Sequence, residues 1–441
     1  MMRLRQIARA VNGRPSPDEL DGPVTGVSTD TRTLKRGDLF FALRGAAYDG
    51  HAFLRDAFAK GAAAAVVDHP VDGPALVVDD TLRALGELAA AWRMALSARV
   101  VGVAGSNGKT TTKDMIAHIL GQDRRIVKAQ GSFNNSVGVP LTLFQADAST
   151  EVAILEVGTN HPGEMAALGR IARPDVAVLV SVGAEHLEGL GSIDGVAAEE
   201  VSFLDHLRAG GAAVVHDDIR ILSRLKLPWW RTTVFGFGEG ADTRPSEVGP
   251  GMRFVLRGVE FTLGLLGEWN LQNALAAVAT CERLGVPLED CARRLRDFKG
   301  PKMRMERLSL AGVTILNDAY NSNPESALRA VREFGRFLTG GRRVAVIGDM
   351  RELGEHSERY HRELGRALAE TPVDVVVAVG AEARAVAEEV GPAKQLHRFA
   401  SVEEVRPHLG SLVREGDAVL LKGSRSVGLE RLVKWMGERV A

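Results

Sequence analysis

The stretch GVAGSNGKTTT, residues 102–112, decides the fold, because it joins an apolar strand to a helix through a glycine-rich turn. The run VVGVA at 100–104 is typical of a buried strand, and Met115, Ile116 and Ile119 share one face of the helix that follows. The free N–H groups of such a turn and the positive end of the helix dipole attract phosphate. The stretch therefore predicts a phosphate-binding loop in an α/β domain, and not a turn that only packs a helix onto a strand.

Within this loop, Lys109 would bridge the β and γ phosphates of ATP, and the hydroxyl of Thr110 would hold Mg²⁺. Val103 stands where the common G-x-x-x-x-G-K-[ST] pattern has its first glycine, and glycines occur at 102 and 105 instead. That spacing indicates a particular subset of phosphate-loop enzymes. The expected ATP contacts of the loop are Gly105, Ser106, Asn107, Gly108, Lys109, Thr110 and Thr111.

Two more residues follow apolar strand-like runs of the same domain. Glu156 stands near the end of VAILEV at 152–157, and His186 comes just after VAVLVSV at 176–182. Ligands gather at the carboxyl ends of parallel strands, and carboxylate oxygens suit Mg²⁺, while a histidine can complete the shell of a second ion. Each residue alone is equally typical of an ordinary loop. Their shared position favours a metal site formed by Thr110, Glu156 and His186.

The order of strand-like and helical segments predicts an α/β protein of several domains, as the length of 441 residues also does. A small α/β unit covers residues 1–82. A central unit at 83–299 has a mostly parallel sheet with helices on both faces, and its glycine-rich stretch at 236–251 is a surface excursion. A third series of apolar runs makes residues 300–441 another α/β unit.

Composition excludes several classes of protein. The net charge of −1 lacks the electrostatic attraction that drives binding to nucleic acid or anionic membranes. No apolar run is long enough for a membrane span, and the amino-terminal sequence MMRLRQIARAVNG predicts an amphipathic helix with Leu4, Ile7, Ala8 and Val11 on one face, not a signal peptide. We therefore expect a cytoplasmic, monomeric protein.

Segments along the whole chain resemble the Mur ligases, ATP-dependent enzymes that build the peptide stem of bacterial peptidoglycan. In the central unit these segments are GVAGSNGKTTT, FNNSVGVP at 133–140, LEVGTN at 155–160 and HLEGLGS at 186–192. In the third unit they are NDAYNSNPESA at 317–327, IGDMRELGEHS at 347–357 and LKGSRS at 421–426, which look like the member that adds D-alanyl-D-alanine. STDTR and GDLFFAL near the amino terminus resemble its UDP-substrate domain.

The resemblance implies three domains: the first holds a UDP-linked substrate, the second holds ATP, and a Rossmann-like third closes on the site. The implied reaction joins D-alanyl-D-alanine to UDP-N-acetylmuramoyl-tripeptide through an acyl phosphate, with ATP and Mg²⁺, for peptidoglycan synthesis. Two alternatives remain open. One is a related ligase, such as a folylpolyglutamate synthase-like enzyme, and the other is a nucleotide-gated scaffold protein without catalysis.

The resemblance also implies roles for single residues, which are carried over position by position. Asn134 and Asn135 would lie near the metal and the acyl phosphate. The expected contacts with the UDP-linked substrate are Asp30, Thr31, Arg32, Phe40 and Ala42. Those with ATP outside the loop are Asn270, Arg304 and Asp318, and Tyr320, Asn321 and Asn323 would come from the closing domain to bind substrate.

Two positions depart from the family pattern. Glu200 stands where most members carry a carbamylated lysine that helps to hold a second Mg²⁺; a glutamate there supplies a permanent negative charge, about three bonds nearer the backbone. We expect Glu200, or Glu199 beside it, to act on Mg²⁺ through water, so that bicarbonate does not stimulate CO₂-depleted enzyme. Trp269 replaces the usual histidine and would offer adenine a flat surface.

Overall fold

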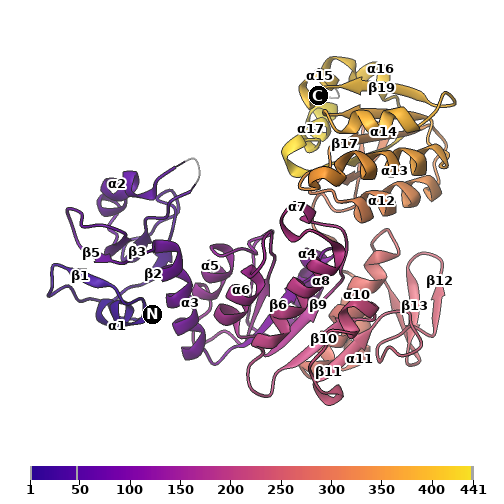
Figure 1. Ribbon diagram of the computed structural model, residues 1–441. Coiled ribbons are helices and arrows are strands. Elements are labelled where there is room, and N and C mark those ends of the chain that lie inside the picture. Colours follow the sequence, from indigo (N-terminus) through magenta and orange to yellow (C-terminus); the bar gives the residue numbers. More distant parts are fainter. Residues whose placement is uncertain (1, 46–47, 439–441) are drawn as a thin grey trace.

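The computed structural model describes residues 2–45 and 48–438, and this part of the chain forms three α/β units (Figure 1). Each unit has a main sheet of its own, and the three sheets follow one another along the chain. The first and third units lie at different ends of the central unit (Figure 1). This arrangement confirms the predicted α/β class.

The first unit is a five-stranded sheet in the order β1-β5-β4-β3-β2, parallel except for β1. Its helix α1 (Leu4–Ala10) buries Leu4, Ile7 and Ala8, as the apolar spacing predicts. The other elements of this unit are β1 (Arg14–Ser16), β2 (Gly26–Ser28), β3 (Asp38–Phe41), η1 (Gly50–Phe53), α2 (Leu54–Ala59), β4 (Ala64–Val67) and β5 (Ala75–Val77). Helix α3 (Thr81–Ala95) follows and packs against α5 and α6 of the central unit.

The central sheet has six parallel strands in the order β11-β10-β9-β6-β8-β7. They are β6 (Arg99–Ala104), β7 (Ile126–Lys128), β8 (Val152–Glu156), β9 (Val176–Leu179), β10 (Ala212–His216) and β11 (Thr232–Phe235). The three apolar runs predicted as strands at 100–104, 152–157 and 176–182 form β6, β8 and β9. The run at 176–182 forms a shorter strand than expected, because Ser181 leaves the sheet to bind the backbone of residues 106 and 107.

Helices cover both faces of this sheet, as predicted. In β6, Val100 and Ala104 pack on one side, whereas Val101 and Val103 pack on the other. The first side is covered by α3, α5 (Gly138–Phe144), α6 (Glu164–Ala172) and α8 (Ile193–Ser202), and the second by α4 (Lys109–Leu120), α10 (Trp269–Arg283) and α11 (Leu288–Leu295). A sheet that is buried on both faces has the continuous apolar strands seen here.

The remaining segments of the central unit are short. Between β9 and β11 lie α7 (Leu187–Leu190), η2 (Phe203–His206), α9 (Ile219–Leu222) and η3 (Trp229–Arg231). The glycine-rich stretch 236–251 leads into a separate antiparallel sheet of β12 (Glu247–Gly249), β13 (Arg253–Leu256) and β14 (Val259–Thr262). Residues 247–249 are exposed, as expected for a surface excursion.

The third unit is a six-stranded sheet in the order β15-β16-β20-β17-β18-β19, parallel except for β15. Its strands are β15 (Glu306–Leu310), β16 (Val313–Asp318), β17 (Arg343–Gly348), β18 (Val375–Val379), β19 (Gln395–Phe399) and β20 (Ala418–Lys422). Its helices are α12 (Pro324–Arg336), η4 (Gly354–His356), α13 (Ser357–Ala369), α14 (Ala383–Glu389), α15 (Val402–Val405), η5 (Arg406–His408), α16 (Leu409–Leu412), η6 (Arg425–Val427) and α17 (Glu430–Glu438). Among the described residues, no helix has the length and apolar character needed to cross a membrane.

Candidate active site

A cavity of about 470 Å³ lies where the central and third units meet, and residues of both units line it. Its size lies within the usual range for sites that bind small molecules. The predicted residues that line it are Ser106, Asn107, Gly108, Lys109, Thr110, Thr111, Asn134, Asn135, Glu156, His186, Asn270, Arg304, Asp318, Tyr320, Asn321 and Asn323. The structure thus brings together segments that are more than 200 residues apart in the chain.

The phosphate loop requires glycine at two positions. Gly105 has a φ of +118°, and a Cβ there would lie 2.8 Å from the backbone of Ser181. Gly108 has a φ of +89°, and a Cβ there would lie 2.1 Å from Oδ1 of Asn273. Both the positive φ and the lack of space exclude other residues. The two glycines let the loop pass close to its neighbours and reach the first residue of α4, Lys109.

Lys109 lies within this loop and is mostly buried. Its ammonium group donates to the carbonyl oxygens of Gly105 and Ser106 and is 3.6 Å from Oε1 of Glu185. Burial disfavours the charge, but the carboxyl groups around Lys109, led by Glu185, outweigh burial and raise its pKa. A protonated lysine is therefore available to a phosphate at this point.

Glu156, at the end of β8, is buried beside the first turn of α4. Its Oε2 accepts from Oγ1 of Thr110 at 2.9 Å and is 3.3 Å from the ammonium group of Lys113. Its Oε1 accepts from the amide of Asn134 at 3.3 Å. Lys113 also donates to the carbonyls of Ala129 and Gly131. These bonds hold its ammonium group in place beside the carboxylate of Glu156. Sequence reasoning missed Lys113, although it lies one helical turn after Lys109.

Glu200 lies directly behind the loop and is fully buried. Its Oε2 accepts from the backbone N–H of Gly105 at 2.8 Å, and its Oε1 has no hydrogen-bond partner. Burial raises the pKa of Glu200 to about 8, despite the attraction of Lys109. Without a bound metal ion, burial thus favours the protonated carboxyl group over the negative charge expected from the sequence.

The side chain of Glu199 contacts the start of α6 and not the phosphate loop. Its two oxygens accept from the N–H groups of Gly163 and Met165 at the start of α6, at 2.9 and 2.8 Å. Of the two glutamates, only Glu200 thus offers an unpaired oxygen next to the loop. The expected action of Glu200 through water, and the independence from bicarbonate, remain predictions.

Replacing Glu200 by glutamine should make folding less sensitive to pH. The folded chain holds the Glu200 proton up to about pH 8, whereas the unfolded chain releases it near 4.5. Between these values the folded state binds more protons, so its stability falls as pH rises, by at most about 5 kcal/mol. Thermal unfolding at pH 5 and 8.5 should show a smaller decrease for Glu200→Gln than for the unchanged chain. Exposed Glu239→Gln is the control, and equal pH dependence in all three would contradict the assignment.

His186 contacts carboxylates of both the central and the third unit. Its Nδ1 is 2.5 Å from Oε2 of Glu352, in the third unit, and its Nε2 is 3.9 Å from Oε2 of Glu185. This contact with His186 lowers the pKa of Glu352. Burial raises the pKa of Glu185. Glu185 and Glu352 were not predicted, although Glu185 directly precedes His186.

The third unit contacts the phosphate loop directly. Asn107 accepts from the side-chain amide of Asn323 at 2.9 Å and donates to Oε2 of Glu325 at 2.8 Å. Asn323 also caps α12, whose first turn contains Glu325. Asn323 thus both caps α12 and holds the start of this helix against the loop.

Arg304, Tyr320 and Asp318 form the neighbouring part of this contact. Arg304 donates to Oγ1 of Thr110 at 2.9 Å, and its guanidinium lies 4.3 Å above the ring of Tyr320. The hydroxyl of Tyr320 contacts Oγ of Ser132 in the central unit. Asp318 pairs with Lys422 at 2.8 Å, and the same lysine donates to the carbonyl of Asn321.

Two other predicted residues, Asn135 and Asn270, have hydrogen-bond partners within the central unit. Asn135 accepts from the N–H groups of Val137 and Gly138, so its oxygen caps the start of α5. Asn270 donates to the carbonyl of Leu266 at 2.7 Å. Trp269 is partly buried and lines the cavity beside it, where the expected contact with adenine remains a prediction.

The five residues predicted to bind the UDP-linked substrate lie in the first unit and do not line this cavity. Arg32 forms an exposed pair with Asp30, whose pKa the guanidinium lowers to about 2. The carbonyl of Thr31 accepts from Lys60. Phe40 and Ala42 are buried in the core of the first unit, so their side chains offer no surface to a substrate. For these two side chains the structure corrects the prediction, because apolar packing fully encloses them.

Three family models match the chain in sequence order: Mur ligase family, catalytic domain, at residues 23–93; Mur ligase middle domain at 103–281; and Mur ligase, glutamate ligase domain, at 303–425. The UDP-N-acetylmuramoyl-tripeptide--D-alanyl-D-alanine ligase of Bacillus subtilis is 36% identical over 98% of this chain and 97% of its own length. The chain belongs to the Mur ligase family.

Solved structures agree with this assignment. MurF from Acinetobacter baumannii superposes on this Mur ligase with a TM-score of 0.87 and 32% identity over 98% of each chain. MurF from Thermotoga maritima, in complex with ADP, gives a TM-score of 0.82 and 30% identity over 95% of this chain and 99% of that one. The similarity therefore extends over all three units and their arrangement.

Proposed function

We propose that this Mur ligase is a MurF-type enzyme that joins D-alanyl-D-alanine to UDP-N-acetylmuramoyl-tripeptide with cleavage of ATP to ADP and phosphate. The single observation that carries the proposal is the shared cavity, where a phosphate loop of the central unit meets Arg304, Tyr320 and Asn323 of the third. The full-length relatives named for this reaction support the choice of substrates. We propose that the enzyme acts in the cytoplasm, where ATP and UDP-linked precursors are found. We also propose that it is a monomer.

The cavity suits ATP in its charge and shape. The start of α4, including Lys109, supplies N–H groups, a helix dipole and an ammonium group for the phosphates. Asn270 and Trp269 line the same cavity and would hold the adenosine part. The solved MurF of Thermotoga maritima, which binds ADP, supports this reading.

The donor groups also fit Mg²⁺. Thr110 and Glu156 present a hydroxyl and a carboxylate side by side, and hard oxygen donors of this kind suit Mg²⁺. His186 lines the same cavity, and buried Oε1 of Glu200 lacks a partner. Thr110 and Glu156 would hold one Mg²⁺ ion, and His186 would be a ligand of a second ion. When bound, Mg²⁺ supplies positive charge that offsets the charge of the triphosphate.

The residues can support two chemical steps. In the first, a carboxylate oxygen of the tripeptide attacks the γ-phosphorus, and the bond from this phosphorus to the ADP oxygen breaks. Lys109 stabilises the charge that develops in this transfer. In the second, the amine of D-alanyl-D-alanine attacks the activated carbonyl, phosphate leaves with its bonding electron pair, and the amine nitrogen gives up a proton, which phosphate can accept. The two units together would position the reactants, which is the main contribution expected of a site of this type.

An ADP-release assay with each acceptor present or omitted tests this function. We expect rapid release only when UDP-N-acetylmuramoyl-tripeptide and D-alanyl-D-alanine are both supplied. Release with a folate and glutamate would support the folylpolyglutamate synthase-like alternative. ATP binding without any acceptor-dependent release would support the scaffold alternative and contradict the proposal.

A further inference from the structure

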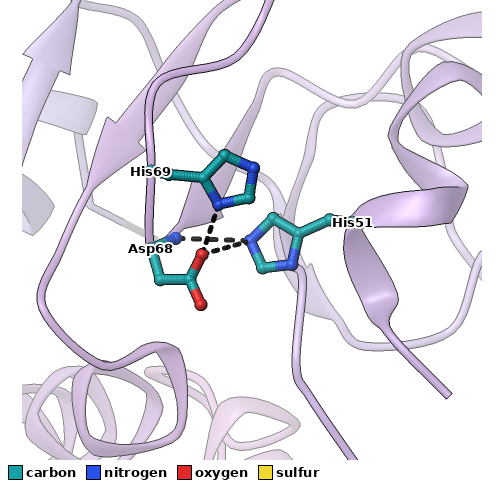
Figure 2. A group of neighbouring side chains, drawn as sticks. All are labelled: His51, Asp68 and His69. Atoms are coloured by element: carbon teal, nitrogen blue, oxygen red, sulfur yellow. Dashed lines mark hydrogen bonds and ion pairs between the residues drawn. The ribbon is translucent and has the colours of Figure 1, made fainter.

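His51, Asp68 and His69 form a compact cluster in the first unit, far in sequence from the phosphate loop (Figure 2). One potential ligand atom from each of them lies within 4.8 Å of the others. His51 belongs to η1, which follows β3, and the other two directly follow β4. Because β3 and β4 are parallel neighbours, their carboxyl ends bring the three side chains to one edge of the sheet.

The hydrogen bonding of His51 leaves one ring nitrogen for a cation. Nδ1 is 2.6 Å from Oδ1 of Asp49, and because a carboxylate only accepts, Nδ1 carries the proton. In the neutral ring, Nε2 then carries a lone pair, yet it lies 3.2 Å from Oδ1 of Asp68. Among the residues that the structure describes, only the backbone N–H of Asp68, at 3.3 Å, offers it a weak donor. A positive ion between the lone pair and the carboxylate would remove this repulsion.

The cluster also has the surroundings of a metal site. A metal-bound histidine usually donates its other N–H to a carboxylate, which is the part that Asp49 takes here. The side chain of His51 is only 8% exposed, whereas that of His69 is 49% exposed, so an ion could enter from solvent and keep a water ligand. In addition, Nδ1 of His69 contacts the same Oδ1 of Asp68.

We propose that His51, Asp68 and His69 bind a Zn²⁺ ion that fastens η1 to the end of β4. Two imidazoles and one carboxylate suit Zn²⁺, whereas sites for Mg²⁺ and Ca²⁺ are built mainly from oxygen ligands. Ligand atoms around a tetrahedral Zn²⁺ are about 3.3 Å apart, so small side-chain movements would complete the site. This site is separate from the cavity and does not depend on the proposed reaction.

Arg44 is the one competing cation of this cluster among the described residues. Its guanidinium lies 2.7 Å from Oδ2 and 3.2 Å from Oδ1 of Asp68. The side chain of Arg44 is 56% exposed and can move aside, so Zn²⁺ would replace its contact with Oδ1. Removing the charge of Arg44 should therefore strengthen Zn²⁺ binding, whereas removing one of the three ligands should weaken it.

The test measures Zn²⁺ binding to the metal-free full chain by competition with a coloured chelator, with excess Mg²⁺ to occupy oxygen-rich sites. We expect one tight Zn²⁺ per chain. His69→Ala should weaken the affinity at least about 100-fold, and Asp49→Asn, which removes the partner of His51, about 10-fold. Arg44→Gln should bind more tightly, and His408→Ala, on the exposed surface of the third unit, should not change.

Thermal unfolding with and without Zn²⁺ provides a second measurement on the same proteins. Zn²⁺ should raise the unfolding temperature of the unchanged chain and of His408→Ala, but not of His69→Ala, because only the folded site binds. Half-exposed His69 can be removed without a cavity in the core, so this variant should fold. Equal Zn²⁺ affinity in His69→Ala and the unchanged chain, or no tight binding in either, would overturn the proposal.

Discussion

Lys109→Met should lower kcat for ADP release about 100- to 1000-fold, because it removes the ammonium group that we propose to contact the transferred phosphoryl group. Methionine has a similar length, so the loop keeps most of its packing. The carboxyl groups of Glu185 and Glu200 would lose the attraction that lowers their pKa values, and they would be protonated more readily. The variant should therefore fold, and its defect should appear in the chemical step.

Steady-state ADP release at saturating ATP and both acceptors measures this effect. Lys128→Met is the matched control, because Lys128 also pairs with a carboxylate, Asp114, but lies at the surface of the same unit. It should keep the activity of the unchanged enzyme. A decrease of less than tenfold for Lys109→Met would contradict the assignment of the phosphate loop.

Glu156→Gln should affect both catalysis and stability. It removes a carboxylate from the proposed Mg²⁺ site, which should lower kcat at least about 100-fold, equal to about 2.7 kcal/mol of the barrier. It also removes the nearer carboxylate partner of the ammonium group of Lys113, which is 1% exposed, and leaves only Asp114, at 3.8 Å. Breaking a buried pair of this kind costs about 3 kcal/mol of the free energy of unfolding.

A double variant separates the two effects. Lys113→Met removes the buried charge, so Glu156→Gln with Lys113→Met should recover much of the stability that Glu156→Gln loses. It should not recover activity, because the metal ligand is still absent. Denaturant unfolding and ADP release over a range of Mg²⁺ concentrations measure the two properties. Recovery of activity in the double variant would mean that Glu156 only positions Lys113.

Local sequence patterns predicted much of the fold. The apolar spacing of Leu4, Ile7 and Ala8 predicted α1, and the strand runs around the phosphate loop all became parallel strands with helices on both faces. Gly105 and Gly108 could be recognised because their need for a positive φ is a property of the backbone itself. These features could be predicted from the sequence because each depends only on neighbours within a few residues.

Other features could not be read from the sequence. Phe40 lies in a motif that resembles a substrate site, yet packing places its side chain in the core. Glu199 and Glu200 are adjacent in sequence, but one caps α6 and the other enters the protein behind Gly105. The raised pKa of Glu200 depends on that burial, which no local pattern records.

The sequence by itself determined the phosphate loop, the order of strands and helices, and the residues at the strand ends that could reach a nucleotide. Only the tertiary structure decided which segments meet there, including Asn107 with Asn323 and Thr110 with Arg304. Only it brought His51 beside Asp68 at the edge of the first sheet. The physical reason is that backbone preference and periodicity act over a few residues, whereas contacts between units, burial and charge depend on the whole folded chain.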